Sequence, residues 1–214
     1  MHAGVKLLAA DLQRIFTARL QSLLTYGDAA DPEGVHTVAF VERLGFQDLT
    51  ACAPRAAEWR RAGAAAPLLL TRDEFLRTLD VFPLEYGGII ANHQVVLGED
   101  LLKHVQVSEA DLRRACELHV KSHLIHLREG YLESGGQTKA VSQLISASAA
   151  ALSSLLANLR RLDPSAAERA GLTSELVREI VNAGTTTIAD PTPLLARYVA
   201  AVERLWQEVD RWRP

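Results

Sequence analysis

Residues 23–41 read LLTYGDAADPEGVHTVAFV. A run of strand-forming residues over 22–26 leads into the stretch and ends at Gly27. A polar loop follows, and the stretch closes with a nearly continuous apolar run over 37–41. Such a short apolar run is typical of a buried strand, and a glycine at a strand end lets the backbone turn. The stretch therefore predicts two strands joined by a loop.

This arrangement resembles the opening of the nucleotidyltransferase fold, the superfamily of DNA polymerase beta, the antibiotic nucleotidyltransferases and the small MNT-type proteins. In that family the turn reads Gly-Ser or Gly-Gly, and the second strand carries two acidic residues one apart. Here the turn is Gly27-Asp28, and the matching strand positions read His36-Thr37-Val38. The resemblance implies the scaffold of this fold without its metal-binding pair of acids.

The missing pair matters because nucleotidyl transfer depends on positioning and on charge neutralisation by magnesium. Side chains at i and i+2 of a strand share a face, so His36 and Val38 occupy the place where a metal pair would be held. Histidine is a poor magnesium ligand and valine is none. The nearby Asp28, Asp31 and Glu33 match no ligand spacing, and we interpret them as a solvated acidic loop. A rearranged metal site that uses them is the alternative.

The resemblance continues in residues 81–100, VFPLEYGGIIANHQVVLGED. We predict a strand over 81–86 that carries Glu85, where the family has its third carboxylate, and a short last strand over 94–97. Residues 111–133 resemble the first long helix of a helical domain that follows in one bacterial branch of the family. The resemblance implies Asp28 and Glu85 as catalytic candidates, and Mg²⁺ and ATP as cofactors if the transferase activity survives.

The same resemblance implies a cleft between the two domains that holds nucleotide and acceptor. Its candidate nucleotide-binding residues are Gly27, Asp28 and His36. Because a lone carboxylate does not hold two metals, the sequence favours a protein that is not an active enzyme.

The pattern of the whole chain predicts an α+β protein of two domains. Strands alternate with helices through residue 107, including a helix over 46–61 and a capped helix over 72–79. Residues 108–214 carry long helical patterns over 109–133, 138–162 and 190–212, typical of an antiparallel bundle. We therefore expect a mixed sheet flanked by helices in 1–107 and a helical bundle in 108–214.

Composition restricts the classes of partner. The net charge is −3 and lysine and arginine form no cluster, which argues against nucleic-acid binding. No stretch approaches the roughly 20 uninterrupted apolar residues of a membrane span, and no signal peptide is recognisable. Cys52 and Cys116 lie in unrelated segments and are expected to be buried thiols in a reducing compartment. We expect a cytoplasmic protein, with a homodimer or a protein partner as further alternatives.

One further cluster concerns metals. Cys116, His119, His123 and His126 lie at i, i+3, i+7 and i+10 of one predicted helix. Histidines spaced in this way can share a zinc ion. However, no acid lies among them and a further ligand would have to come from another helix, so we favour histidines that pack at an interface.

Three hypotheses follow. The first is a nucleotidyltransferase-like protein that has lost metal-dependent transfer and serves as a nucleotide-binding or interaction protein. The second is an active nucleotidyltransferase with a relocated magnesium site. The third is a structural subunit that docks a partner through its helical domain. Converging carboxylates would favour the enzyme, whereas a site filled by Tyr26, Phe40 and Tyr86 would favour the structural role.

Overall fold

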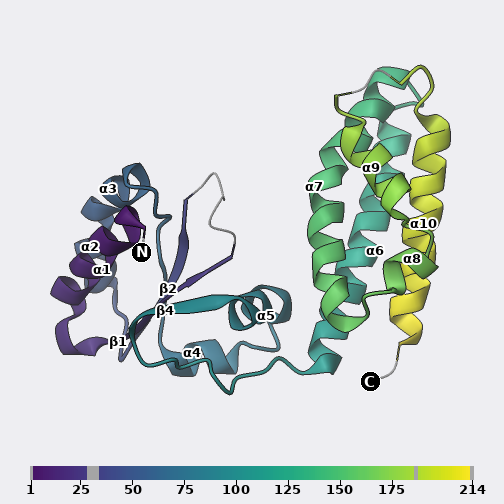
Figure 1. Cartoon of the computed structure of the whole chain (residues 1–214). Helices are drawn as coiled ribbons and strands as arrows, with labels where there is room; N and C mark the ends of the chain where they lie inside the picture. The colour runs from purple at the N-terminus through teal and green to yellow at the C-terminus, as the bar shows by residue number, and fades with distance from the viewer. Residues whose placement is uncertain (1, 28–33, 186–187, 213–214) are drawn as a thin grey trace. The chain divides into compact units, whose positions relative to one another are not determined.

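The computed structural model describes residues 2–27, 34–185 and 188–212. The chain divides into two compact units, Met1–Ser108 and Glu109–Pro214. The first unit contains a small sheet with helices, and the second is helical (Figure 1). The predicted fold class, α+β, is confirmed.

The described residues of the first unit form eleven short elements, four of which are strands. In chain order these are α1 (Ala3–Phe16), η1 (Thr17–Arg19), β1 (Leu20–Tyr26), β2 (His36–Val41), α2 (Phe46–Cys52), η2 (Ala53–Arg55), α3 (Ala56–Arg61), β3 (Leu68–Leu70), α4 (Arg72–Arg77), α5 (Pro83–Ala91) and β4 (His93–Gly98). The strand order is β3-β2-β1-β4. β1 pairs antiparallel with both β2 and β4, and β2 pairs parallel with β3.

Each face of the sheet has its own apolar cluster, because successive strand residues point to opposite faces. On one face Leu23, Ala39 and Val41 pack with Phe16 of α1 and Trp59 of α3. On the other face the sheet packs with α4 and α5. That cluster joins Leu24, Val38, Phe40, Leu70, Phe75, Tyr86, Ile89 and Leu102. Both faces of the sheet are therefore covered within this unit.

Two expectations for this unit are wrong. In place of the predicted strand over 81–86, residues 81–82 form a turn and α5 begins at Pro83. Proline suits that place because it has no N–H to leave unpaired, and burial of Tyr86 and Ile89 against the sheet overrides the strand propensity of the segment. The single helix predicted over 46–61 is split into α2, η2 and α3 around Pro54, which cannot continue a helical hydrogen-bond ladder.

Other predictions for this unit are confirmed. β1, β2, β3 and β4 lie at the expected strand positions to within two residues. The predicted capping box at Thr71 and Glu74 is present, with the Glu74 amide donating to Thr71 Oγ1 at 3.1 Å.

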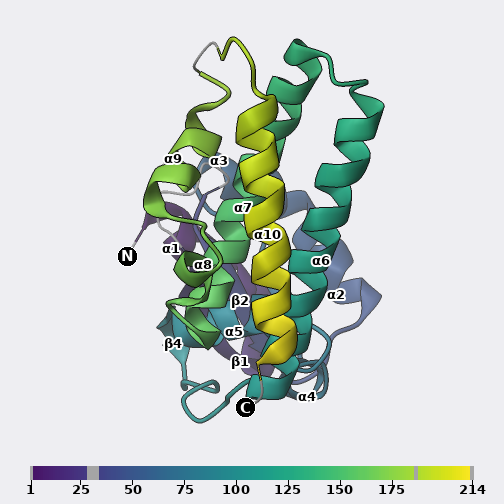
Figure 2. The same cartoon turned by 90° about the vertical axis from the view of Figure 1, so that its right-hand side faces the viewer.

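The described residues of the second unit form five helices. They are α6 (Glu109–Glu133), α7 (Thr138–Leu162), α8 (Ala166–Arg169), α9 (Ser174–Asn182) and α10 (Thr192–Arg211). Figure 2 shows α6, α7 and α10 side by side. The turn between α6 and α7 contains Gly135 and Gly136, both with positive φ, a backbone conformation that favours glycine. Leu124, Ile145 and Tyr198 are among the buried residues of the core.

Helix α7 is both long and apolar. Among the described residues it is the one helix whose length and apolar composition would suffice to cross a membrane. Leu152, Leu155 and Leu159 lie on its buried face within the bundle. A core helix of a helical bundle meets the same criterion of length and composition.

Candidate functional site

The glycine turn at the end of β1 is tied to the residue that follows α5. Gly27 has φ +78°. Its N–H donates to the Asn92 carbonyl oxygen at 3.4 Å, and its own carbonyl accepts from Asn92 Nδ2 at 3.3 Å. The N–H of Gly27, the backbone donor that the structure describes at this turn, therefore already has a protein partner. Asp28, Asp31 and Glu33 lie outside the described residues.

The two positions that stand where the family has acids differ in environment. His36 is half-buried at the start of β2, opposite Tyr26 in the strand register, with the two ring centroids 5.7 Å apart. Val38 lies opposite Leu24 and is 0% exposed. A carboxylate at the position of Val38 would be surrounded by hydrocarbon, where an ion without a partner is strongly disfavoured.

Aromatic side chains close this face of the sheet. The Phe40 and Phe75 rings meet edge to face with centroids 5.5 Å apart, and Phe75 stacks on Tyr86 at 4.2 Å. Tyr26 packs at the margin of the cluster, and its burial raises the pKa of its phenol. Such ring pairs stabilise a core beyond the area that they bury. Tyr26, Phe40 and Tyr86 thus fill the face that the resemblance assigns to the metal ions.

Glu85 lies on a helix and not on a strand. It occupies the first turn of α5, where a carboxylate interacts favourably with the helix dipole. Its neighbours Leu84 and Tyr86 are buried, whereas Glu85 itself is exposed. The structure does not bring Glu85 and Val38 together as a site on adjacent strands.

The four metal candidates on α6 point in different directions. Cys116 and His123 are buried, and His119 and His126 are exposed. Burial raises the pKa of the Cys116 thiol to about 11, which disfavours the thiolate that binds metals. Within the ranges that the structure describes, no group of three or more histidine, cysteine, aspartate or glutamate residues is placed to hold a metal ion.

His123 has a structural partner. Its Nε2 lies 2.5 Å from the Tyr198 hydroxyl of α10, inside the bundle. Burial lowers the pKa of His123 and raises that of Tyr198 to about 12. The pair therefore holds a neutral imidazole against a protonated phenol. The sequence signal for this buried pair was the position of His123 among the apolar residues of α6.

Sequence reasoning missed a buried carboxylate in the first unit. Asp11 of α1 is 1% exposed, and its Oδ2 accepts from Arg55 Nε at 2.9 Å and from Trp59 Nε1 at 2.8 Å. Burial alone would raise the pKa of Asp11, but these hydrogen bonds and the nearby Arg14 bring it below its usual value. The sequence signal for this buried carboxylate was the position of Asp11 among the apolar residues of α1. The arrangement joins α1 to α3 and is structural.

A second missed feature is a hydroxyl in the sheet. Thr37 Oγ1 is buried, and among the side-chain atoms that the structure describes it is the one found buried without a hydrogen-bond partner. Because successive residues of a strand alternate, the Thr37 side chain lies on the other face of the sheet from the Val38 side chain.

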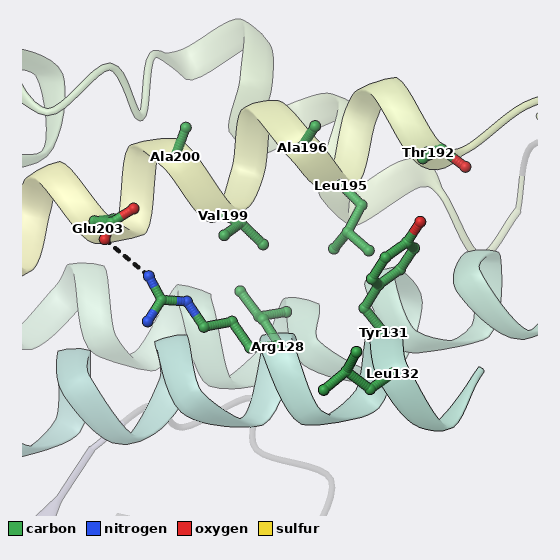
Figure 3. A pocket seen from close by; sticks show the side chains of 10 residues that line it. Arg128, Tyr131, Leu132, Thr192, Leu195, Ala196, Val199, Ala200 and Glu203 are labelled. Atoms are coloured by element: carbon green, nitrogen blue, oxygen red, sulfur yellow. Dashed lines mark hydrogen bonds and ion pairs between the residues drawn. The ribbon is translucent and has the colours of Figure 1, made fainter. Parts of the chain in front are cut away.

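The second unit carries an apolar groove between α6 and α10 with a volume of about 520 Å³. Tyr131 and Leu132 lie toward one end, and the ion pair of Arg128 and Glu203, with 2.8 Å between nitrogen and oxygen, lies toward the other (Figure 3). Val199 of α10 forms part of the wall between them. The volume of the groove falls within the range of ligand sites, but its two charged side chains, Arg128 and Glu203, are already paired with each other.

Comparison with known proteins finds similarity among solved structures but none among sequences. No family model matches the chain, and no curated protein sequence matches it. Among solved structures, the chain is similar to spectinomycin adenyltransferase AAD(9) from Enterococcus faecialis, determined with ATP and spectinomycin. The TM-score is 0.49 and the identity 11%, over 97% of this chain and 98% of that one.

Proposed function

We propose that this chain is a nucleotidyltransferase-like protein that does not transfer nucleotides and that acts as an interaction protein. The resemblance of the strand–glycine–loop–strand stretch supplies the scaffold. The observation that supports the loss of transfer is the environment of Val38, which is buried among Leu24, Phe40 and Phe75.

The chemistry follows from that environment. A two-metal site needs carboxylates that converge on an open surface, where the metal ions also meet the phosphates of the substrate. The face of β2 that carries Val38 is closed by α4 and α5, and Glu85 is exposed on α5. The backbone of Gly27 is engaged by Asn92. These three features favour an interaction role over a catalytic one.

Calorimetry with ATP, with and without magnesium, tests this function on the full chain. We expect no binding in either condition, and no transfer of labelled AMP to any acceptor tested. Binding that depends on magnesium would overturn the proposal and favour an active enzyme that uses Asp28, Asp31 or Glu33. Binding that does not depend on magnesium would replace the interaction role with that of a nucleotide sensor.

A further inference from the structure

Residues 99–105, here called the strap, follow β4 and contribute to the apolar cluster on the face of the sheet that carries Val38. Leu102 is 1% exposed within that cluster, and Leu101 and Val105 are partly buried against it. The Val105 N–H donates to the Leu102 carbonyl oxygen at 3.0 Å, so the strap forms a turn of its own. The strap therefore helps to enclose Val38.

His93, the first residue of β4, joins the strap to the end of α5. Its Nε2 lies 3.1 Å from Asp100 Oδ1, and the same carboxylate oxygen accepts from the Leu102 N–H at 3.0 Å. On the other side of the ring, Nδ1 lies 3.1 Å from the Ile89 carbonyl oxygen and 3.0 Å from that of Ile90. The His93 side chain is 12% exposed and that of Asp100 is 33% exposed. Both ring nitrogens thus take part in the connection.

The oxygens that the two ring nitrogens face are all hydrogen-bond acceptors. A neutral imidazole has one N–H and one lone pair, so one of its nitrogens would turn a lone pair toward an oxygen. An imidazolium donates from both nitrogens. The carbonyls of Ile89 and Ile90 also lie at the C-terminal end of α5, where the helix dipole favours a positive charge. The charged ring of His93 therefore satisfies every contact, whereas the neutral ring does not.

Asp100 supplies the negative charge. Burial would raise the pKa of Asp100, but a backbone N–H of the strap, His93 and Lys103 bring it below its usual value. The carboxylate is therefore ionised at every pH above about 4. Glu99, Lys103 and His104, the other charged or titratable residues of the strap, are exposed.

The elements packed around His93 carry further titratable side chains. On β1, Tyr26 lies opposite His93 in the strand register, and burial raises the pKa of its phenol. His36 lies beyond Tyr26 on β2. Glu85 lies in the first turn of α5, whereas His93 contacts carbonyls of the last turn. Among the described residues, Asp100 is the charged side chain that forms an ion pair with His93.

We propose that His93 is a pH-dependent latch, whose charged form fastens the strap to α5 and whose neutral form releases it. Histidine side chains change charge between about pH 5 and pH 8. The closed strap holds a proton on His93 that the open strap does not need, so the closed form is favoured below this range and is lost as the pH rises through it. Release withdraws Leu102 from the apolar cluster and opens the Val38 face at that place.

Amide hydrogen exchange of the full chain, followed by NMR, measures the opening constant of the strap, the ratio of its open to its closed form. The reporters are the amides of Leu102 and Val105, whose hydrogen bonds the strap holds. We expect the opening constant to rise about three- to tenfold between about pH 5.5 and about pH 7.5, the effect of losing one partly buried charge-assisted hydrogen bond. Each rate is divided by the rate of an unstructured peptide at the same pH. The amide of Phe40 in β2 is the internal reference for opening of the whole unit.

Three variants assign the titrating group. His93→Gln can still donate to the carbonyls of α5 but does not titrate, so the pH dependence should disappear. Asp100→Asn should also remove it, because an amide can face either form of the ring while its oxygen still accepts from the strap. His104→Gln is the matched control, since His104 is an exposed histidine of the same strap. It should leave the three- to tenfold change intact, and circular dichroism checks the fold of each variant.

Several outcomes would overturn the latch. They are an opening constant that does not change with pH, a change that persists in His93→Gln or Asp100→Asn, and a change that disappears in His104→Gln. NMR of the His93 ring in the unaltered chain gives a readout that needs no variant. We expect a proton on both ring nitrogens at the lower pH, and a proton on only one of them would also overturn the latch. Because no measurement here involves a nucleotide, failure of the latch is distinct from failure of the proposed function.

Discussion

The indole N–H of Trp59 donates a hydrogen bond of 2.8 Å to Asp11 Oδ2, and this bond joins α3 to α1 beneath the sheet. Arg55 Nε donates to the same oxygen at 2.9 Å. A buried carboxylate is stable only when such donors surround it, because its desolvation is otherwise uncompensated. The first unit therefore contains a hydrogen-bonded carboxylate, Asp11, beside the apolar cluster that packs α1 and α3 against the sheet.

Replacing this carboxylate should destabilise the first unit. We expect Asp11→Asn to lower the free energy of unfolding by about 1–3 kcal/mol, because the charged acceptor is lost and an amide N–H₂ faces the donors. Chemical denaturation measures the change. Asp73→Asn is the matched control, since Asp73 forms an exposed pair with Arg77 and should cost no more than about 0.5 kcal/mol. Equal effects of the two variants would show that burial of Asp11 contributes nothing.

The environment of Val38 gives a second prediction. Val38→Asp should lower the free energy of unfolding by more than about 3 kcal/mol, because the carboxylate would enter an apolar cluster. Val81→Asp is the matched control, since Val81 is 61% exposed and should change stability by less than about 0.5 kcal/mol. Thermal unfolding of both variants, with and without magnesium, measures these changes in stability. A folded Val38→Asp chain that magnesium stabilises would contradict a closed face.

The pair of His123 and Tyr198 predicts how stability depends on pH. Burial lowers the pKa of His123 from 6.5 in the folded state, so the unfolded chain binds a proton at higher pH than the folded one does. Stability should therefore be lost as the pH falls below about 6.5 and regained above it. Unfolding in denaturant at a series of pH values measures this slope. His123→Gln, which cannot titrate, should flatten it, and an unchanged slope would assign the effect to other groups.

Two glycines at strand ends give a matched pair of substitutions. Gly27 and Gly98 both have positive φ, at +78° and +75°. A Cβ at Gly98 would clash with the Gln21 carbonyl oxygen, whereas a Cβ at Gly27 would meet nothing within 4 Å. Gly27→Ala should cost about 1 kcal/mol from the strained backbone alone. Gly98→Ala should cost at least about 2 kcal/mol more because β1 and β4 must separate. Denaturation midpoints compare them, and equal losses would contradict the clash.

Local patterns predicted much of the fold. The apolar run ending at Val41 and the triple leucine of β3 indicated strands, and the Thr71 capping box indicated the start of α4. The long helices α6 and α7 were predicted with the bounds that they have in the structure. These elements follow from residues near each other in the chain, through hydrophobic periodicity and capping.

The prediction failed where distant contacts decide the conformation. Residues 81–86 have strand propensity, but Tyr86 stacks on Phe75 and Ile89 joins the same cluster. A helix buries both side chains on one face, and Pro83 suits its first turn. Glu85 consequently lies on a helix, and the third carboxylate of the resemblance has no strand to occupy.

The sequence by itself determined that the acidic pair is missing from β2, because the identity of His36 and Val38 does not depend on packing. Only the tertiary structure decided that Val38 is enclosed while Leu118 is exposed. Burial depends on which elements pack against a residue, and those elements come from parts of the chain that local periodicity does not relate.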